Sequence, residues 1–184
     1  YTATGTATGV NSEDLSAGLN LSNTTHTNAG TYNSDTWTFT DAAGNYNDAN
    51  GTVDDNIAKA NATINVTPYD ETYDSLPHTA TGTAIGVNSE DLSGLLDLSN
   101  TTHTNASVYD NDPWSFAGNA NYNSANGTVD DNIAKTDANC SSIAGYNVTY
   151  DASSHTASGS CQGVGSDGTL SGLVLTATTH INAG

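Results

Sequence analysis

Pairs of neighbouring acidic side chains are the first residues in this chain whose type and spacing could do chemistry. They are Glu13 with Asp14, Glu90 with Asp91, Asp54 with Asp55, and Asp130 with Asp131. A calcium ion binds where several carboxylate and carbonyl oxygens converge. The sequence has no DxDxDG loop to bring such oxygens together, so we favour a solvated acidic surface and keep calcium as the alternative. We expect no other cofactor.

Histidine and lysine are the next candidates. His26, His103 and His180 recur in the segments TTHTNA, TTHTNA and TTHINA. Each is alone in its stretch of sequence, so we expect hydrogen bonds that stabilise turns, with metal binding or catalysis as the alternative. Lys59 and Lys135 both end the segment NIAK. We expect them to pair with carboxylates, and an intramolecular Lys–Asn isopeptide bond is the alternative.

The chain is rich in Asn-x-Ser/Thr sequences, which accept N-linked glycans on secreted proteins. The candidates that we single out are Asn23, Asn61, Asn65, Asn100, Asn105 and Asn147. The same pattern also occurs at Asn20, Asn50, Asn126 and Asn139. Because Asn, Ser and Thr are so common here, chance alone produces many such matches.

No combination of residues predicts an enzyme. We find no nucleophile elbow, no glycine-rich phosphate loop, no Ser/His/Asp order and no paired catalytic carboxylate motif. We therefore expect no catalytic activity.

The composition is strongly acidic and narrows the choice of partners. The 184 residues include 20 Asp and Glu but only 2 Lys and Arg, which gives a formal net charge of −18. Binding to nucleic acid or to anionic membranes needs a basic surface, so both classes of partner are excluded. No stretch approaches the roughly eighteen consecutive apolar residues of a membrane helix, so we expect no membrane insertion in this segment.

An internal repeat organises the chain. The stretch TATGTATGVNSEDLS at 2–16 returns as TATGTAIGVNSEDLS at 79–93 and, degraded, as TASGSCQGVGSDGTLS at 156–171, so successive copies begin 77 residues apart. Such a period indicates tandem modules. We predict a first repeat over 1–59 that lacks its opening strand, a complete repeat over 60–135, and a third over 136–184 that lacks its closing strands.

Alternating patterns predict short strands throughout. Thr alternates with Ala or Gly over 2–9 and 79–84, and Trp37 and Phe39 alternate with threonines. A period of two is the strand period. We expect a further strand over 61–67 that ends at Pro68, and a turn over 70–77. The predicted fold class is all-β, with β-sandwich repeats in tandem.

Cys140 and Cys161 are the only cysteines. In the repeat alignment Cys140 falls near Ile64 in the opening strand, and Cys161 falls on Ala84 in the threonine-rich strand. Adjacent strands would place the two thiols side by side, so we favour a disulfide over free thiols or a metal pair. A bridge that closes a loop of about 20 residues would stabilise by ~3 kcal/mol and implies an oxidising compartment.

The segment YDSLPHTATGTAIGVNSEDLSGLLDLSNTTHTNA, followed by WSF and NIAK, resembles the MBG-type repeats of very long bacterial surface proteins. The resemblance covers the whole chain and implies tandem Ig-like β modules that act as stalk material. The third copy departs from the pattern, because VGSDGTLS replaces VNSEDLS and it holds both cysteines.

These observations predict a structural module of an extracellular, cell-surface or secreted stalk or filament. The alternative is an adhesin module that binds carbohydrate or another surface through its loops or its Thr-rich face. The expected partners are neighbouring repeats, identical subunits in a filament, and surface glycans. The chain has no Met and opens inside a repeat, so we expect a window of a longer secreted chain, or else subunits that donate strands head to tail.

Overall fold

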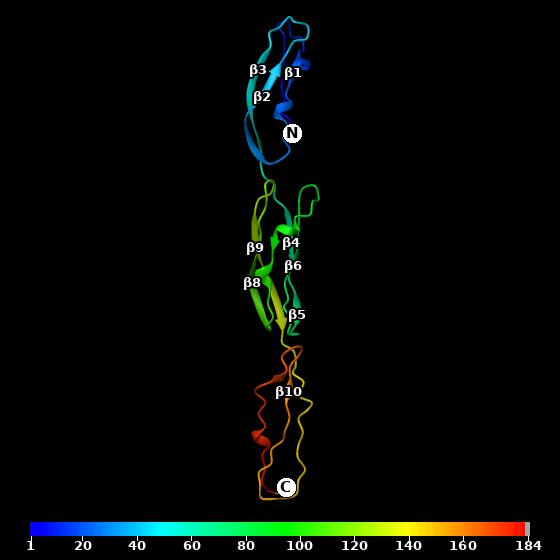
Figure 1. The fold of residues 1–184 in the computed structure, drawn as a ribbon, viewed down its shortest axis with the longest axis vertical. Coiled ribbons are helices and arrows are strands. Elements are labelled where there is room, and N and C mark those ends of the chain that lie inside the picture. The colour runs from blue at the N-terminus through cyan, green and yellow to red at the C-terminus, as the bar shows by residue number, and fades with distance from the viewer. Residues whose placement is uncertain (183–184) are drawn as a thin grey trace. The chain divides into compact units, whose positions relative to one another are not determined.

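A computed structural model describes residues 1–182, which contain β-strands, short 3₁₀ turns and irregular segments (Figure 1). The chain divides into two compact units. Unit 1 comprises Tyr1–Thr63, Ala84–Leu95 and Phe116–Ala125, and unit 2 comprises Ile64–Thr83, Leu96–Ser115 and the residues from 126 onward. No helix in the described residues is long and apolar enough to cross a membrane.

The strands confirm an all-β chain. They are β1 (Leu19–Asn20), β2 (Gly30–Phe39), β3 (Ala49–Ile57), β4 (Thr63–Thr67), β5 (Asp70–Thr72), β6 (Thr81–Ile85), β7 (Leu96–Asp97), β8 (Ser107–Phe116), β9 (Ala125–Ala134), β10 (Cys161–Gln162) and β11 (Thr169–Leu170). The 3₁₀ turns are η1 (Ser16–Gly18), η2 (Ser22–Thr24), η3 (Ser93–Leu95), η4 (Ser99–Thr101) and η5 (Thr176–Thr178). The strand orders are β1-β2-β3, β4-β6, β5-β9-β8-β7 and β10-β11.

The sheet of unit 1 is antiparallel and forms where the alternation predicts it. In β2, Trp37 is half-buried and Phe39 is 9% exposed, while Thr36 and Thr38 face solvent. Gly51 of β3 lies opposite Trp37, and a Cβ atom there would approach the indole to 2.7 Å. The indole therefore packs directly on bare backbone.

The threonine-rich strand shows the predicted two faces. In β6 the threonines Thr81 and Thr83 are exposed, whereas Ala84 is fully buried. Residues 2–8 show the same alternation of Thr out and Ala in, but they form no regular strand, because no neighbour pairs with residues 2–7 along their length. Side-chain alternation survives there without a strand partner.

The predicted turn over 70–77 is wrong in its first part. Asp70–Thr72 forms β5, which pairs in parallel with Asn132–Ala134 of β9. Pro68 directly follows the end of β4, and the next strand, β5, belongs to the sheet β5-β9-β8-β7. Local polarity suggested a turn, and pairing with a distant strand overrides it.

Residues 136–182 contain little regular structure. Their strands are β10 and β11, which pair over Cys161–Leu170 and Gln162–Thr169. The opening strand predicted around Cys140 is replaced by isolated bridges at Asn139 and Ala144. A further isolated bridge in this stretch joins His155 to His180.

The buried hydrophobic residues include Phe116, which is only 1% exposed. We expect Phe116→Ala to lower the free energy of unfolding by about 3–5 kcal/mol, because truncating a buried aromatic ring loses its transfer free energy and leaves a cavity. Denaturant unfolding followed by Trp114 fluorescence, in a Trp37→Phe background, would measure the change. The control is Val108→Ala on the same strand, since Val108 is 64% exposed. Equal losses for both variants would contradict the assignment of Phe116 to the core.

Candidate functional site

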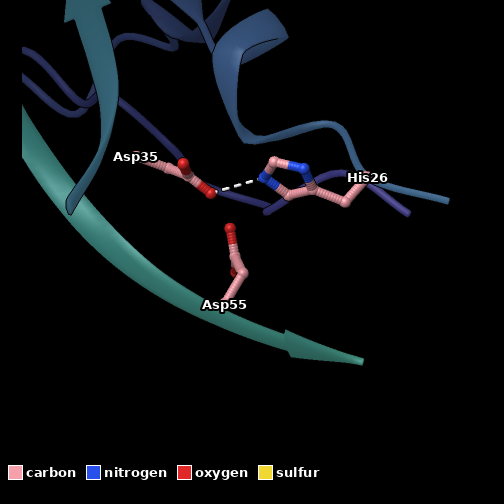
Figure 2. Close-up of side chains that lie close together, drawn as sticks. All are labelled: His26, Asp35 and Asp55. Carbon is pink, nitrogen blue, oxygen red and sulfur yellow. Dashed lines mark hydrogen bonds and ion pairs between the residues drawn. The ribbon is translucent and has the colours of Figure 1, made fainter. Parts of the chain in front are cut away.

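The one group of three or more His, Cys, Asp or Glu side chains whose ligand atoms converge, among residues 1–182, lies in unit 1. It consists of His26, Asp35 and Asp55, and the chosen atoms all lie within 4.8 Å of one another. Figure 2 shows the dashed contact from His26 Nε2 to Asp35 Oδ2, 2.6 Å long, with the Asp55 carboxylate beside it. The His26 ring also stacks on Tyr32, with ring centroids 3.5 Å apart.

A β-bulge in β2 aims Asp35 at this histidine. The register with β3 shifts between Tyr32 and Asp35, and Ser34 adopts a positive φ of 62°. The extra residue returns Asp35 to the inner face with Tyr32, which a regular strand would not do. The backbone amide of Ser34 donates to Asp54 Oδ1 at 2.8 Å, so the Asp54 carboxylate stabilises the backbone of the bulge.

The same contacts recur in unit 2. His103 Nε2 lies 2.7 Å from Asp112 Oδ2, and its ring stacks on Tyr109 at 3.6 Å. Asn111, the counterpart of Ser34, also has a positive φ of 61°, and its amide donates to Asp130 Oδ1. The recurrence indicates that this histidine–carboxylate arrangement is part of how the sheet is built.

Asp131 corresponds to Asp55, and its surroundings differ. Asp131 is 1% exposed, and its Oδ1 accepts the backbone N–H of Tyr69 at 3.0 Å. Burial raises the pKa of Asp131 above its usual range, and the hydrogen bond from Tyr69 opposes that shift. Asp55 is half-buried, and no hydrogen bond from residues 1–182 reaches it. In both residues Oδ2 is buried without a partner, so the two sites differ in exposure and in the Tyr69 amide that Asp131 alone accepts.

The side chains of the first site can act as metal ligands or as hydrogen-bond acceptors. One imidazole nitrogen and two carboxylates form a ligand set of the kind that binds Zn²⁺ with an open coordination position. The counterpart Asp131 shows a second use for the same oxygen, as the acceptor of a strand amide. Neither metal binding nor acceptance of a backbone amide requires a nucleophilic side chain.

The other acidic residues named from the sequence are used locally. Asp14 Oδ1 and Asp91 Oδ1 accept the backbone N–H of Ser16 and Ser93, each at 2.9 Å. Asp55 is the one calcium candidate that lies in the converging cluster. A solvated acidic surface stays the prediction for these residues, and calcium binding stays its alternative.

Glu13 and Glu90 each receive a tyrosine hydroxyl, which the sequence did not predict. Tyr46 donates to Glu13, and Tyr122 donates to Glu90. These hydrogen bonds lower the pKa of both glutamates and raise that of both tyrosines. A Cβ atom at Gly86 would collide with Glu90 and with the Tyr122 hydroxyl as they are placed, so glycine leaves room for this hydrogen bond. The sequence signal for this contact was the recurrence of glycine, glutamate and tyrosine at matching positions of the first two repeats.

The rings of His26 and His103 each bond an aspartate of a strand, a partner that was not foreseen, and turn stabilisation by these histidines stays a prediction. His78 pairs with Asp74 at 3.0 Å, and its backbone forms an antiparallel bridge with His103. His180 forms such a bridge with His155. The expected lysine–carboxylate pairing is wrong: the four ion pairs among residues 1–182 all use histidine, and Lys59 Nζ instead donates to the carbonyl of Asn119 at 2.7 Å. Lys59 lies beyond the end of β3, beside the loop that contains Asn119.

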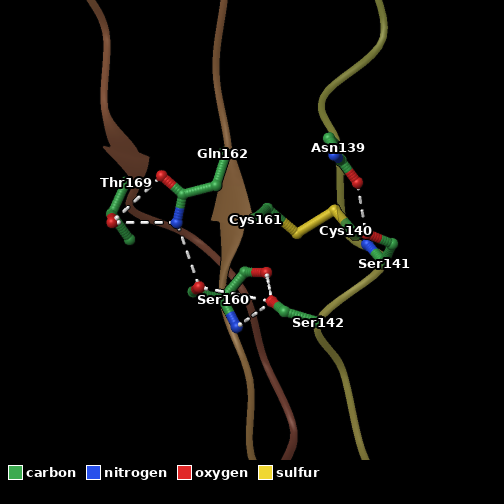
Figure 3. Close-up of a disulfide and its surroundings, with 8 residues drawn as sticks. All are labelled: Asn139, Cys140, Ser141, Ser142, Ser160, Cys161, Gln162 and Thr169. Carbon is green, nitrogen blue, oxygen red and sulfur yellow. Dashed lines mark hydrogen bonds between the residues drawn. A yellow bond between two sulfur atoms is a disulfide. The ribbon is translucent and has the colours of Figure 1, made fainter.

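The disulfide joins Cys140 to Cys161, whose Cα atoms lie 4.1 Å apart (Figure 3). Ser142 Oγ donates to the carbonyl of Ser160 at 2.6 Å next to it. The predicted bridge is thus present, on the small-residue face of the third copy.

All predicted glycosylation positions are exposed. Asn65 lies in β4 on its outward side, whereas Asn61 precedes the strand and its Oδ1 accepts from Asn123. Their modification stays a prediction.

Comparisons of the chain with models of known protein families, with curated proteins and with solved structures found no match.

We expect Asp131→Asn to gain stability relative to the original chain as the pH rises from about 4 to 7. The folded chain raises the pKa of Asp131 above its ordinary 3.8, so ionisation of Asp131 costs stability as the pH rises through the folded pKa. The variant has no charge to desolvate. Chemical unfolding at several pH values would measure the difference in free energy between the two proteins.

Asp137→Asn, on an exposed residue, is the control for the loss of one negative charge. A stability difference that is independent of pH would show that Asp131 is not penalised by burial.

Proposed function

We propose that this chain is a structural repeat module of an extracellular stalk or filament and has no catalytic activity. The observation that supports this proposal best is the repeated use of matching side chains for internal contacts. Glu13 and Glu90 each hold a tyrosine, and His26 and His103 each hold an aspartate. Side chains that form the same internal contact in both of the first two copies contribute to the architecture of the repeat, which favours a structural role.

Two buried threonines at matching positions also form the same internal hydrogen bonds. Thr24 and Thr101 are 1% and 0% exposed, and each hydroxyl accepts the amide of an alanine, Ala3 or Ala80, at 3.0 Å. Each hydroxyl also donates to a leucine carbonyl at 2.8 Å. Such hydroxyls are fully occupied within the fold, which favours a structural role over recognition.

The fold that we propose for the repeats is an Ig-like sandwich. In its support, one stretch contributes β4 to the sheet with β6 and then β5 to the sheet with β9. The resemblance to MBG-type repeats of bacterial surface proteins supports the same architecture. The Cys140–Cys161 disulfide supports an oxidising, extracellular location.

A stalk must resist extension, so the test is mechanical. With the chain held between handles at its two ends, we expect discrete unfolding steps. The disulfide spans 21 positions and shields that stretch, so reduction should lengthen the extended chain by about 70 Å, at roughly 3.5 Å per residue.

The Cys140→Ser/Cys161→Ser double variant is the control, and its extended length should not change with reductant. Extension without any force peak would contradict the stalk proposal. Saturable binding to a defined glycan on an array would instead favour the adhesin alternative.

A further inference from the structure

The cluster of His26, Asp35 and Asp55 is built from three neighbouring segments of unit 1. His26 follows η2, Asp35 lies in β2, and Asp55 lies in β3. Tyr32 of β2 is the register partner of Asp55, so these two side chains share one face of the sheet. The bulge returns Asp35 to that face, and the three ligand atoms then lie within 4.8 Å of one another (Figure 2).

Neighbouring side chains fix the orientation of the His26 ring. The ring stacks on Tyr32, with an angle of 6° between the two ring planes. The Tyr32 hydroxyl donates to the carbonyl of Asn28 at 2.8 Å, which holds the tyrosine in turn. Supporting contacts of this kind orient histidines that bind metal ions. The ring is thus held with Nε2 facing the Asp35 carboxylate.

The charge around the cluster favours a bound cation. Two carboxylates at this separation repel each other, and ordinary ion pairs do not neutralise them. Lys59 and Lys135 are the only two Lys or Arg residues of the chain, and the ion pairs among residues 1–182 use neither of them. The formal net charge of −18 also raises the concentration of cations near the protein.

A second observation, from the complete repeat, points to a ligand at the same carboxylate. Asp131 corresponds to Asp55 and is 1% exposed. Its Oδ1 accepts the Tyr69 amide, yet its Oδ2 is buried without a partner among the described residues, as is Oδ2 of Asp55. The opening strand therefore leaves this oxygen free. A buried carboxylate oxygen without a donor is costly unless a cation or a proton satisfies it.

The types of ligand atom select the metal. Calcium and magnesium take oxygen ligands, whereas an imidazole nitrogen suits zinc. One histidine and two carboxylates supply three ligands, and a water molecule would complete the tetrahedron that zinc prefers. We propose that His26 Nε2 and the carboxylates of Asp35 and Asp55 bind a Zn²⁺ ion. This site does not depend on the proposed stalk function.

Zinc binding exchanges a hydrogen bond for metal–ligand bonds. Nε2 lies 2.6 Å from Asp35 Oδ2, and the proton between them leaves for Nδ1 or for solvent. The freed lone pair of Nε2 and the two carboxylates then hold the ion. The ion links the segment after η2 to both β2 and β3. Because only the folded chain brings these three ligands together, zinc stabilises the fold.

The experiment uses the whole disulfide-bonded chain without an affinity tag, and Zn²⁺ is the only transition metal added. Isothermal titration calorimetry measures affinity and stoichiometry, with excess Ca²⁺ present to occupy exposed carboxylates. We expect saturable binding of one Zn²⁺ per chain. The Nε2 resonance of His26 should shift in the ¹⁵N spectrum when zinc is added.

Matched variants test the ligand set. Asp55→Asn keeps the shape of the side chain and leaves the His26–Asp35 contact in place. It should weaken zinc binding by more than about 100-fold, because even a residue that only supports a ligand is worth roughly 10- to 100-fold in affinity. Asp48→Asn removes the same charge from an exposed position and should leave the affinity unchanged. His103→Gln removes the matching histidine of unit 2 and should also leave it unchanged.

Absence of zinc binding would overturn the proposal, and so would binding that Asp55→Asn leaves intact or that excess Ca²⁺ abolishes. Loss of binding in His103→Gln, with Asp55→Asn unaffected, would place the metal in unit 2 and overturn the assignment to His26. Circular dichroism of each variant shows whether it is folded, so a loss of affinity in a folded variant reports on the ligands.

Discussion

The scarcity of basic side chains is the constraint on which much of this structure depends. With 20 Asp and Glu and only 2 Lys and Arg, carboxylates cannot be neutralised by ordinary ion pairs. They accept hydrogen bonds instead, from backbone amides, tyrosine hydroxyls and histidine rings. Asp41 illustrates this solution, because its two oxygens accept the amides of Ala43, Asn45 and Tyr46. These amides lower the pKa of Asp41 and keep it ionised.

This use of carboxylates ties loops to strands. Glu90 accepts the amide of Asn88 in its own turn and the hydroxyl of Tyr122, and that hydroxyl accepts the amide of Val87. The turn and the tyrosine therefore lock each other in place. Gly86 makes the contact feasible, since any side chain there would occupy the space of the Tyr122 hydroxyl. Acidic and glycine residues that look like generic loop composition have specific structural roles.

The closing strand β9 shows the same principle at a buried position. A buried carboxylate needs a hydrogen-bond donor, and the donor for Asp131 is the amide of an opening strand. The matching carboxylate in unit 1, Asp55, lies close to His26 and Asp35 instead, with ligand atoms of all three within 4.8 Å of one another.

Much of the fold could be predicted from the sequence by itself. The period of two located β2, β4 and β6 and the faces of Trp37, Phe39 and the threonines, because alternation is a local property of the pleated strand. Repeat alignment placed Cys161 on the small-residue face and predicted its bond to Cys140, since aligned positions share surroundings. The acidic composition argued against nucleic acid and anionic membranes as partners, because attraction to a polyanion depends on the charge of the surface.

Only the tertiary structure decided which distant residues meet. The sequence predicted a turn at Asp70–Thr72, where the structure has β5. The partner strand β9 lies about 60 residues further along the chain, so the pairing leaves no local pattern in the sequence. The bulge at Ser34 aims Asp35 at His26, and a register shift shows only when two strands are paired. The sequence therefore determined the strands and their faces, while three-dimensional pairing decided the partners of each histidine, tyrosine and buried carboxylate.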